Sequence, residues 1–105
     1  MNADLIARLH SQCDGPRDGA LLRFSLAQAL LEEGLAADAV AECRRALVFN
    51  ADYSAAWKLL GKALLASDDP AAAADAWRHG MDVATSRGDI QAAKEMRVFL
   101  RRLDT

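Results

Sequence analysis

Apolar residues in the middle of the chain recur at the spacing of a helix. In the segment SAAWKLLGKALL, residues 54–65, four positions fall at i, i+3, i+4 and i+7, so they share one helix face. These positions are Trp57, Leu60, Gly61 and Leu64. Asp52 is a candidate N-cap for this helix. Glycine inside a helix costs about 1 kcal/mol relative to alanine, so Gly61 indicates a place where a partner helix packs closely.

Short polar breaks predict where one helix ends and the next begins. In SDDP, Asp69 can cap a helix and Pro70 suits its first position. In the preceding part of the chain, Gly34 has the place of a glycine that ends a helix. Second helices are therefore expected over residues 36–49 and 70–84. Because the connections are short, each pair of helices is expected to pack as an antiparallel hairpin.

The same pattern returns after 34 residues. When the sequence is shifted by 34 positions against itself, leucines fall on leucines and small residues on small residues. Matching pairs are Leu26 and Leu60, Ala29 and Ala63, Leu30 and Leu64, Leu31 and Leu65, Ala39 and Ala73, and Arg44 and Arg78. Ala27 falls on Gly61 and Ala46 on Gly80, which predicts close helix contacts at both places.

This repeat resembles the tetratricopeptide repeat family. The residues that carry the resemblance in the second unit are Trp57, Leu60, Gly61, Ala73 and Trp77, with Leu64 where the family often has tyrosine. The first unit departs from the family's pattern at Arg23, Ala27 and Cys43, which replace the tryptophan, the glycine and the second-helix aromatic. The resemblance implies an all-α fold, a right-handed α-solenoid of antiparallel helix hairpins with about six helices.

A single domain is expected over residues 1–105, with two repeats and atypical ends. Its predicted parts are an N-terminal half-repeat helix (1–14), repeat 1 (20–53), repeat 2 (54–87) and a C-terminal capping helix (88–104). The first helix has apolar residues every four positions, in phase with the second helix of a unit. These residues are Leu5, Leu9 and Cys13, with Ile6 beside them.

The strict period fails in the last helix. Lys94 and Glu95 fall where Leu60 and Gly61 would lie, whereas moving the frame back by two residues places alanines there. The offset frame predicts one buried stripe along this helix. It comprises Ile90, Ala93, Met96, Leu100 and Leu103, widened by Phe99. Gly88 is expected to stop the preceding helix.

Composition and charge narrow the function. The net charge is −2 and the pI about 5.6, which argues against a nucleic-acid binder. No apolar run approaches the ~20 residues that span a bilayer, and the start of the chain has no apolar signal region, so a cytoplasmic protein is expected. The two cysteines, Cys13 and Cys43, are expected to be reduced thiols.

The sequence contains no recognisable catalytic or metal-binding constellation. His10 with Cys13 forms a lone HxxC, whereas zinc sites take three or four ligands, and His79 lies far away in sequence. No phosphate-binding glycine loop or nucleophile motif is present. We therefore expect no catalytic residue, no metal and no cofactor, and a protein that is not an enzyme.

Partner-binding residues are derived from the helix faces opposite the predicted core. At 100° per residue, four positions of the helix 54–65 point away from the buried side, and the equivalent positions lie one period earlier. The candidate residues are Leu21, Phe24, Gln28, Ala55, Lys58, Leu59 and Lys62. In the offset frame Lys94 joins the two lysines. In the resembled family the first helices line a concave groove that often holds a peptide.

Two interpretations of Phe24 stay open: packing against the N-terminal helix, or a partly exposed hot spot for a partner. The lysines are consistent with a solvated face or with a peptide that carries a carboxylate or acidic side chain. Some family members grip a terminal carboxylate with Lys, Arg and Asn. Since the asparagines are missing here and Gln28 is the nearest substitute, that clamp is not assigned.

These observations favour a non-enzymatic protein–protein interaction module that binds a peptide or partner protein in the groove. The alternative is a structural module that self-associates as a homodimer, with no peptide ligand. In that case the incomplete N-terminal repeat exposes a helix-pairing surface at Leu5 and Ile6.

Overall fold

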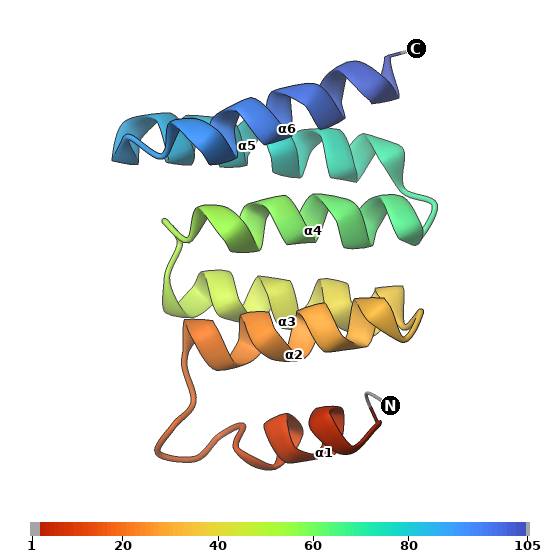
Figure 1. Ribbon diagram of the computed structural model, residues 1–105, viewed down its shortest axis with the longest axis vertical. Coiled ribbons are helices and arrows are strands. Elements are labelled where there is room, and N and C mark those ends of the chain that lie inside the picture. The colour runs from red at the N-terminus through yellow and green to blue at the C-terminus, as the bar shows by residue number, and fades with distance from the viewer. Residues whose placement is uncertain (1–2, 105) are drawn as a thin grey trace.

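The computed structural model describes residues 3–104, and this part of the chain forms six helices with no strand (Figure 1). The helices are α1 (Ala3–Ser11), α2 (Ala20–Glu32), α3 (Ala36–Phe49), α4 (Ser54–Ala66), α5 (Pro70–Arg87) and α6 (Ile90–Leu103). They stack in chain order along the long axis of the molecule, as antiparallel neighbours joined by short turns. The predicted all-α solenoid of helix hairpins is confirmed.

The residues at the turns explain where most helices begin and end. Asp69 caps α5, where its Oδ1 accepts from the Ala72 N–H at 3.1 Å, and Pro70 occupies the first position, as predicted. Gly34 follows the end of α2 with φ 80°, and the Leu35 N–H donates to the Leu30 carbonyl at 2.9 Å. This is the hydrogen bond of a Schellman motif, which closes the helix C-terminus.

The same motif recurs one period later without a glycine. Asp68 lies 34 residues after Gly34 and has φ 62°, and the Asp69 N–H donates to the Leu64 carbonyl at 3.0 Å. An L-residue in the left-handed region has a steric cost that glycine avoids. The second repeat therefore keeps the turn geometry of the first repeat with a less suitable residue.

The predicted N-cap at Asp52 is wrong. The helix α4 begins at Ser54, its N-cap residue is Tyr53, and no side chain caps it. The reason is the preceding turn. The Asn50 side chain accepts from the Asp52 N–H at 3.0 Å, and the Tyr53 N–H donates to the Asn50 carbonyl at 3.2 Å. This turn delays the start of the helix by one residue.

Small residues in the core allow close packing. The α4 glycine, Gly61, lies under the indole of Trp77 from α5, and Gly80 on α5 lies against Met96 and Trp57. In the first repeat, Ala27 and the equivalent second-helix alanine are fully buried. The contacts predicted for these positions therefore exist, although at Gly61 a side chain, rather than a second backbone, fills the space.

The last helix is shifted in a way that the sequence did not indicate. The helices α2 and α4 begin 34 residues apart, whereas α6 begins 36 residues after α4 because α5 is longer than α3. The expected frame corresponded to a shift of 32, which is one helical turn away and so has the same apolar face. Ala93 and Met96 are buried as expected. Ile90, however, is 64% exposed because it is the first residue of the helix.

The helix α1 packs loosely at one end of the stack. It has no fully buried residue. Ile6, Leu9 and Cys13 are half-buried, and they pack against a cluster formed mainly by Leu26 and Leu30 of α2. This packing fits a half-repeat helix that covers the first hairpin.

Candidate partner-binding face

Three helices form one face of the molecule. α2, α4 and α6 lie in the layer nearest the viewer in Figure 1, and α4 contacts both of the others. We call this surface the first-helix face, because α2 and α4 each open a repeat and α6 lies in line with them. It comprises Leu21, Phe24, Gln28, Ala55, Lys58, Lys62, Glu95 and Phe99, together with Tyr53 in the turn before α4.

Phe24 and Tyr53 form an aromatic pair on this face. Their ring centroids are 5.2 Å apart and the ring planes are tilted by 40°. Both side chains are half-buried, and burial raises the pKa of Tyr53, so its hydroxyl stays protonated at neutral pH. Leu21 precedes Phe24 by three residues on the same helix and is 68% exposed. The ring that Phe24 contacts thus belongs to the turn before α4 rather than to the N-terminal helix.

The two lysines of α4 are already engaged with α6. The Lys58 ammonium lies 2.9 Å from the Glu95 carboxylate, and the Lys62 ammonium lies 5.1 Å from the centroid of the Phe99 ring. Both side chains keep part of their surface accessible. The predicted basic wall is therefore partly neutralised by Glu95, a residue that the sequence analysis did not place on this face.

The assignment of Leu59 to the partner-binding face is wrong. Leu59 is only 8% exposed and belongs to the main core cluster. The helix α4 lies in the middle of the stack and contacts α2, α3, α5 and α6, so a wider arc of it is buried than one apolar stripe suggests. Gln28 is exposed on α2, and Ala55 is half-buried in the first turn of α4.

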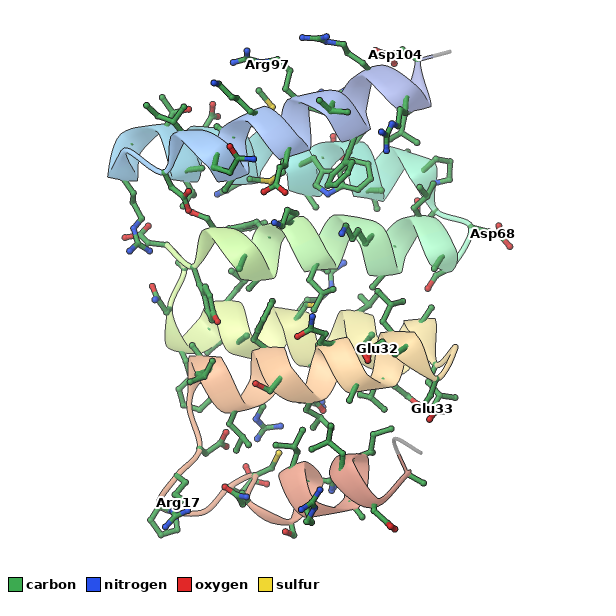
Figure 2. All side chains as sticks on the ribbon, in the orientation of Figure 1. Arg17, Glu32, Glu33, Asp68, Arg97 and Asp104 are labelled. Carbon is green, nitrogen blue, oxygen red and sulfur yellow. The ribbon has the colours of Figure 1, made fainter. Side chains whose placement is uncertain are left out.

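Lys94 does not join the lysines of α4. It lines a hollow of about 320 Å³ at the α5–α6 corner together with Thr85, Gly88 and Arg97. Arg97, three residues further along, points outward from the side of α6 that faces away from α4 (Figure 2). The structure therefore places Glu95, not Lys94, opposite Lys58.

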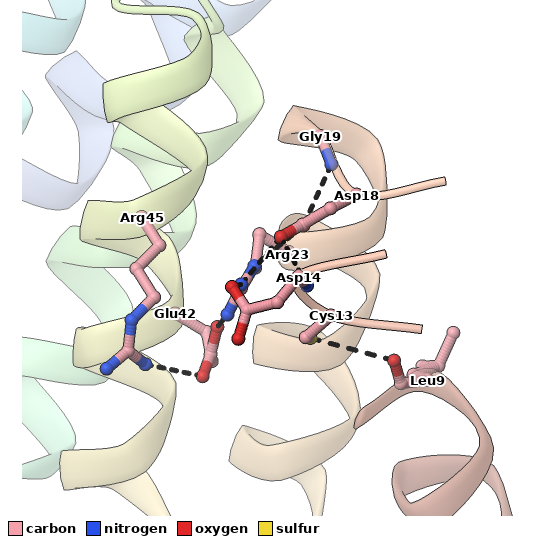
Figure 3. A network of polar contacts seen from close by, with 8 residues as sticks. All are labelled: Leu9, Cys13, Asp14, Asp18, Gly19, Arg23, Glu42 and Arg45. Carbon is pink, nitrogen blue, oxygen red and sulfur yellow. Dashed lines mark hydrogen bonds and ion pairs between the residues drawn. The ribbon is translucent and has the colours of Figure 1, made fainter. Parts of the chain in front are cut away.

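Behind α1, a buried ionic network centres on Arg23, the residue that replaces the family's tryptophan (Figure 3). Its guanidinium lies 2.7 Å from Asp18, 3.0 Å from Glu42 and 3.3 Å from Asp14. Glu42 also accepts from Arg45 at 2.6 Å. Arg23 and Glu42 are both buried, and their carboxylate and guanidinium groups satisfy each other. The network ties the α1–α2 turn to α3.

The charges of this network stabilise one another. Hydrogen bonds from the Arg23 side chain lower the pKa of Asp18 to about 2. The hydrogen bond to Asp18 in turn raises the pKa of Arg23. Since all its polar groups are turned toward one another, the arrangement explains how the N-terminal turn is held in place rather than a reaction.

The thiols and other chemical groups add no reactive centre. Both cysteines are free, and burial raises the pKa of Cys43 to about 12, so it stays a protonated thiol at neutral pH. Within residues 3–104, no group of three or more His, Cys, Asp or Glu side chains is placed to hold a metal ion. In the same range, none of the helices combines the length and apolar character needed to cross a bilayer.

Comparison with known proteins shows two close similarities. The TPR repeat-containing protein PA0015 of Pseudomonas aeruginosa is 49% identical over 87 residues, which cover 83% of this chain and 83% of that protein. The solution structure of protein BPP2914 from Bordetella parapertussis has a TM-score of 0.84 and 43% identity, covering 95% of this chain and 87% of that chain. No protein-family model matches the chain. Sequence and fold are thus shared over most of the molecule.

Proposed function

Since this chain belongs to the tetratricopeptide repeat proteins, we propose that it is a non-enzymatic module that binds a peptide segment of a partner protein on its first-helix face. Helical repeats of this kind suggest protein–protein interaction. Proteins of the family use the corresponding face as a groove for peptides. The proposal here is specific about which residues supply the contact.

One observation carries the proposal: a large apolar side chain, Leu21, stands 68% exposed beside the half-buried Phe24–Tyr53 pair. Aromatic residues that are partly buried and rigid are the usual anchors of interfaces. The Phe24 ring is held by Tyr53, so little conformational freedom is lost when a partner covers it. Lys62, whose ammonium lies over Phe99, adds positive charge at the other end of the face.

A capture experiment with matched variants tests this proposal. Immobilised protein is incubated with extract of its native cell, and bound proteins are compared between the wild type, Leu21→Glu and Val48→Glu. Val48 is 87% exposed on α3, so its variant makes the same kind of change on another helix. A partner retained by the wild type and Val48→Glu but lost with Leu21→Glu supports the proposal. A partner lost with Val48→Glu and kept with Leu21→Glu contradicts it.

A second candidate function is self-association through α1. A hollow of about 770 Å³ lies between α1 and the α2–α3 turn, lined mainly by Ile6, Ala7 and Leu35. Leu5 and Leu35 are exposed, whereas Ile6 is half-buried against the core. Sedimentation at two concentrations tests this candidate. A mass of 11.3 kDa at both concentrations excludes it.

A further inference from the structure

A pocket of about 360 Å³ lies at the N-terminus of α4, next to the first-helix face. It is lined by Tyr53, Ser54, Ala55, Arg87, Gly88 and Asp89. Tyr53 belongs to both sites, since its ring contacts Phe24 and its residue lines the pocket. A ligand that covers Phe24 and Tyr53 therefore ends close to this pocket.

Ser54 gives this pocket an unused polar group. The residue is only 4% exposed, and its hydroxyl has no hydrogen-bond partner. Buried hydroxyl groups are almost always paired, because an unpaired one loses its hydrogen bonds to water. An unpaired buried hydroxyl in the wall of a pocket indicates a ligand that supplies the missing partner.

The helix α4 contributes positive potential at the same place. It is 13 residues long, and no side chain caps its N-terminus. The N–H groups of Ala56 and Trp57 donate to the Tyr53 carbonyl, whereas the two N–H groups before them lie in the first turn, where a helix has no intrahelical acceptor. The macrodipole favours a negative group there.

Arg87, the last residue of α5, adds a full positive charge. One of its guanidinium nitrogens donates to the backbone carbonyl of Asp52, which holds the side chain across the turn before α4. A guanidinium has five N–H donors in a planar fork, so further donors remain for a carboxylate. The pocket thus combines a hydroxyl, backbone N–H groups and a guanidinium.

Asp89 limits the charge of the ligand. Its carboxylate lines the same pocket, and one oxygen accepts from the Ala92 N–H at 3.3 Å to cap α6. A neighbouring negative charge disfavours a doubly charged phosphate more strongly than a singly charged group. The balance of charges fits a monoanion.

We propose that the pocket formed by Ser54, Arg87 and the N-terminus of α4 binds one carboxylate group of the partner, either its C-terminus or an acidic side chain. This proposal rests on the proposed function for the rest of the ligand. It assigns the carboxylate to this pocket rather than to Lys58, which is paired with Glu95. Apolar side chains of the same peptide lie on Leu21 and Phe24.

Amide chemical-shift titration of the full chain tests the pocket without the partner. Acetate serves as the probe for the shared chemistry, and the reported signals are the N–H groups of Ser54 and Ala55. We expect saturable shifts for the wild type and about fivefold weaker binding for both Ser54→Ala and Arg87→Gln, since each removes a hydrogen bond to a charged group. Arg101→Gln, which removes an equal charge from the exposed end of α6, leaves the affinity unchanged.

Further arms distinguish the chemistry and the source of the anion. Asp89→Asn keeps a good N-cap residue and removes the repulsion, so acetate binds more tightly. N-acetylglycine presents a main-chain carboxylate, and N-acetylaspartyl amide presents a side-chain carboxylate; the tighter ligand identifies the source. Phosphate at pH 7.5 binds more weakly than acetate.

The proposal is overturned by any of three results: no saturable shift at Ser54 and Ala55, equal weakening by Arg101→Gln and Arg87→Gln, or preferred binding of phosphate. Ser54→Ala is not expected to lower the thermal midpoint, since the lost hydroxyl has no partner, so unfolding does not confuse the result. The outcome is independent of the partner. Acetate binding combined with unchanged capture by Leu21→Glu removes the proposed function and keeps the pocket.

Discussion

The indole of Trp77 lies directly on the backbone of Gly61. A Cβ atom at residue 61 would come within 2.1 Å of Trp77 Nε1, and this nitrogen donates to the Lys58 carbonyl at 3.1 Å. The ring is therefore held on α4 by both contact and hydrogen bond, one turn from the lysine that faces α6. Glycine in the middle of α4 allows the hairpin to close around a large aromatic residue.

Gly61→Ala is expected to destabilise the protein even though alanine favours a helix by about 1 kcal/mol. The new methyl group overpacks the site against the Trp77 indole, which typically costs about 1 to 3 kcal/mol or more beyond the propensity gain. Urea unfolding measures the loss. In the double variant with Trp77→Leu, the smaller ring-free side chain relieves the clash, so the two effects add to less than their sum. Simple additivity contradicts the packing explanation.

Arg23→Gln is expected to lower the free energy of unfolding by about 2 to 3 kcal/mol, because it leaves Glu42 buried without its cation. The change also releases Asp18 and with it the turn before α2. Chemical unfolding measures the loss. Arg78→Gln breaks an exposed pair with Asp75 and is expected to change stability by at most about 1 kcal/mol. Similar losses for the two variants would show that the network adds nothing.

The Asp18–Arg23 pair predicts a loss of stability in acid. The pKa of Asp18 is lowered from 3.8 to about 2 in the folded chain, so the unfolded chain binds the proton more readily. The contribution is fully present above about pH 4 and is lost as the pH falls toward 2. Thermal midpoints between pH 5 and 2 measure it. Asp18→Asn flattens this dependence, whereas Asp75→Asn, at an exposed pair, keeps the wild-type slope.

The two equivalent turn positions predict opposite effects of substitution. Asp68→Gly is expected to raise the free energy of unfolding by about 0.5 to 1 kcal/mol, since φ 62° suits glycine. Gly34→Ala is expected to lower it by about 1 kcal/mol, because its φ is 80° and alanine is strained there. Thermal unfolding of both variants measures the difference. Destabilisation by Asp68→Gly contradicts the assignment of this turn.

Local sequence patterns predicted those parts of the fold that depend on neighbouring residues. The hairpins, the cap at Asp69 and the glycine stop at Gly34 follow from spacing and backbone preference within a few residues. The register of α6 did not follow, because a slip of four residues returns the same apolar face of a helix. Only the length of α5, which the sequence does not limit, sets the offset.

The polar contacts of the site depend on residues far apart in sequence. Lys58 and Glu95 are separated by 37 positions, and Arg23 and Glu42 by 19. Periodicity identifies the face that each side chain occupies but not its partner across helices. One signal was available: an arginine at the position of the family's buried tryptophan requires a carboxylate, and Glu42 precedes the buried Cys43 on the second helix.

The pocket at α4 was missed for a related reason. Asp52 was expected to cap this helix, which would have filled the end of α4 with a carboxylate of the chain itself. The turn held by Asn50 moves the helix start to Ser54 and leaves this end open. Arg87 reaches the same turn from 35 positions away. Neither event is visible in the local sequence.

The central claim is that a partner binds at Phe24 on the first-helix face. Titration calorimetry of the captured partner's binding segment with wild type and Phe24→Ala tests it most directly, with thermal unfolding as the check that both proteins are folded. The account predicts that Phe24→Ala weakens binding by at least about 1 kcal/mol, a factor of about five in Kd. An unchanged Kd for a folded Phe24→Ala variant would contradict it.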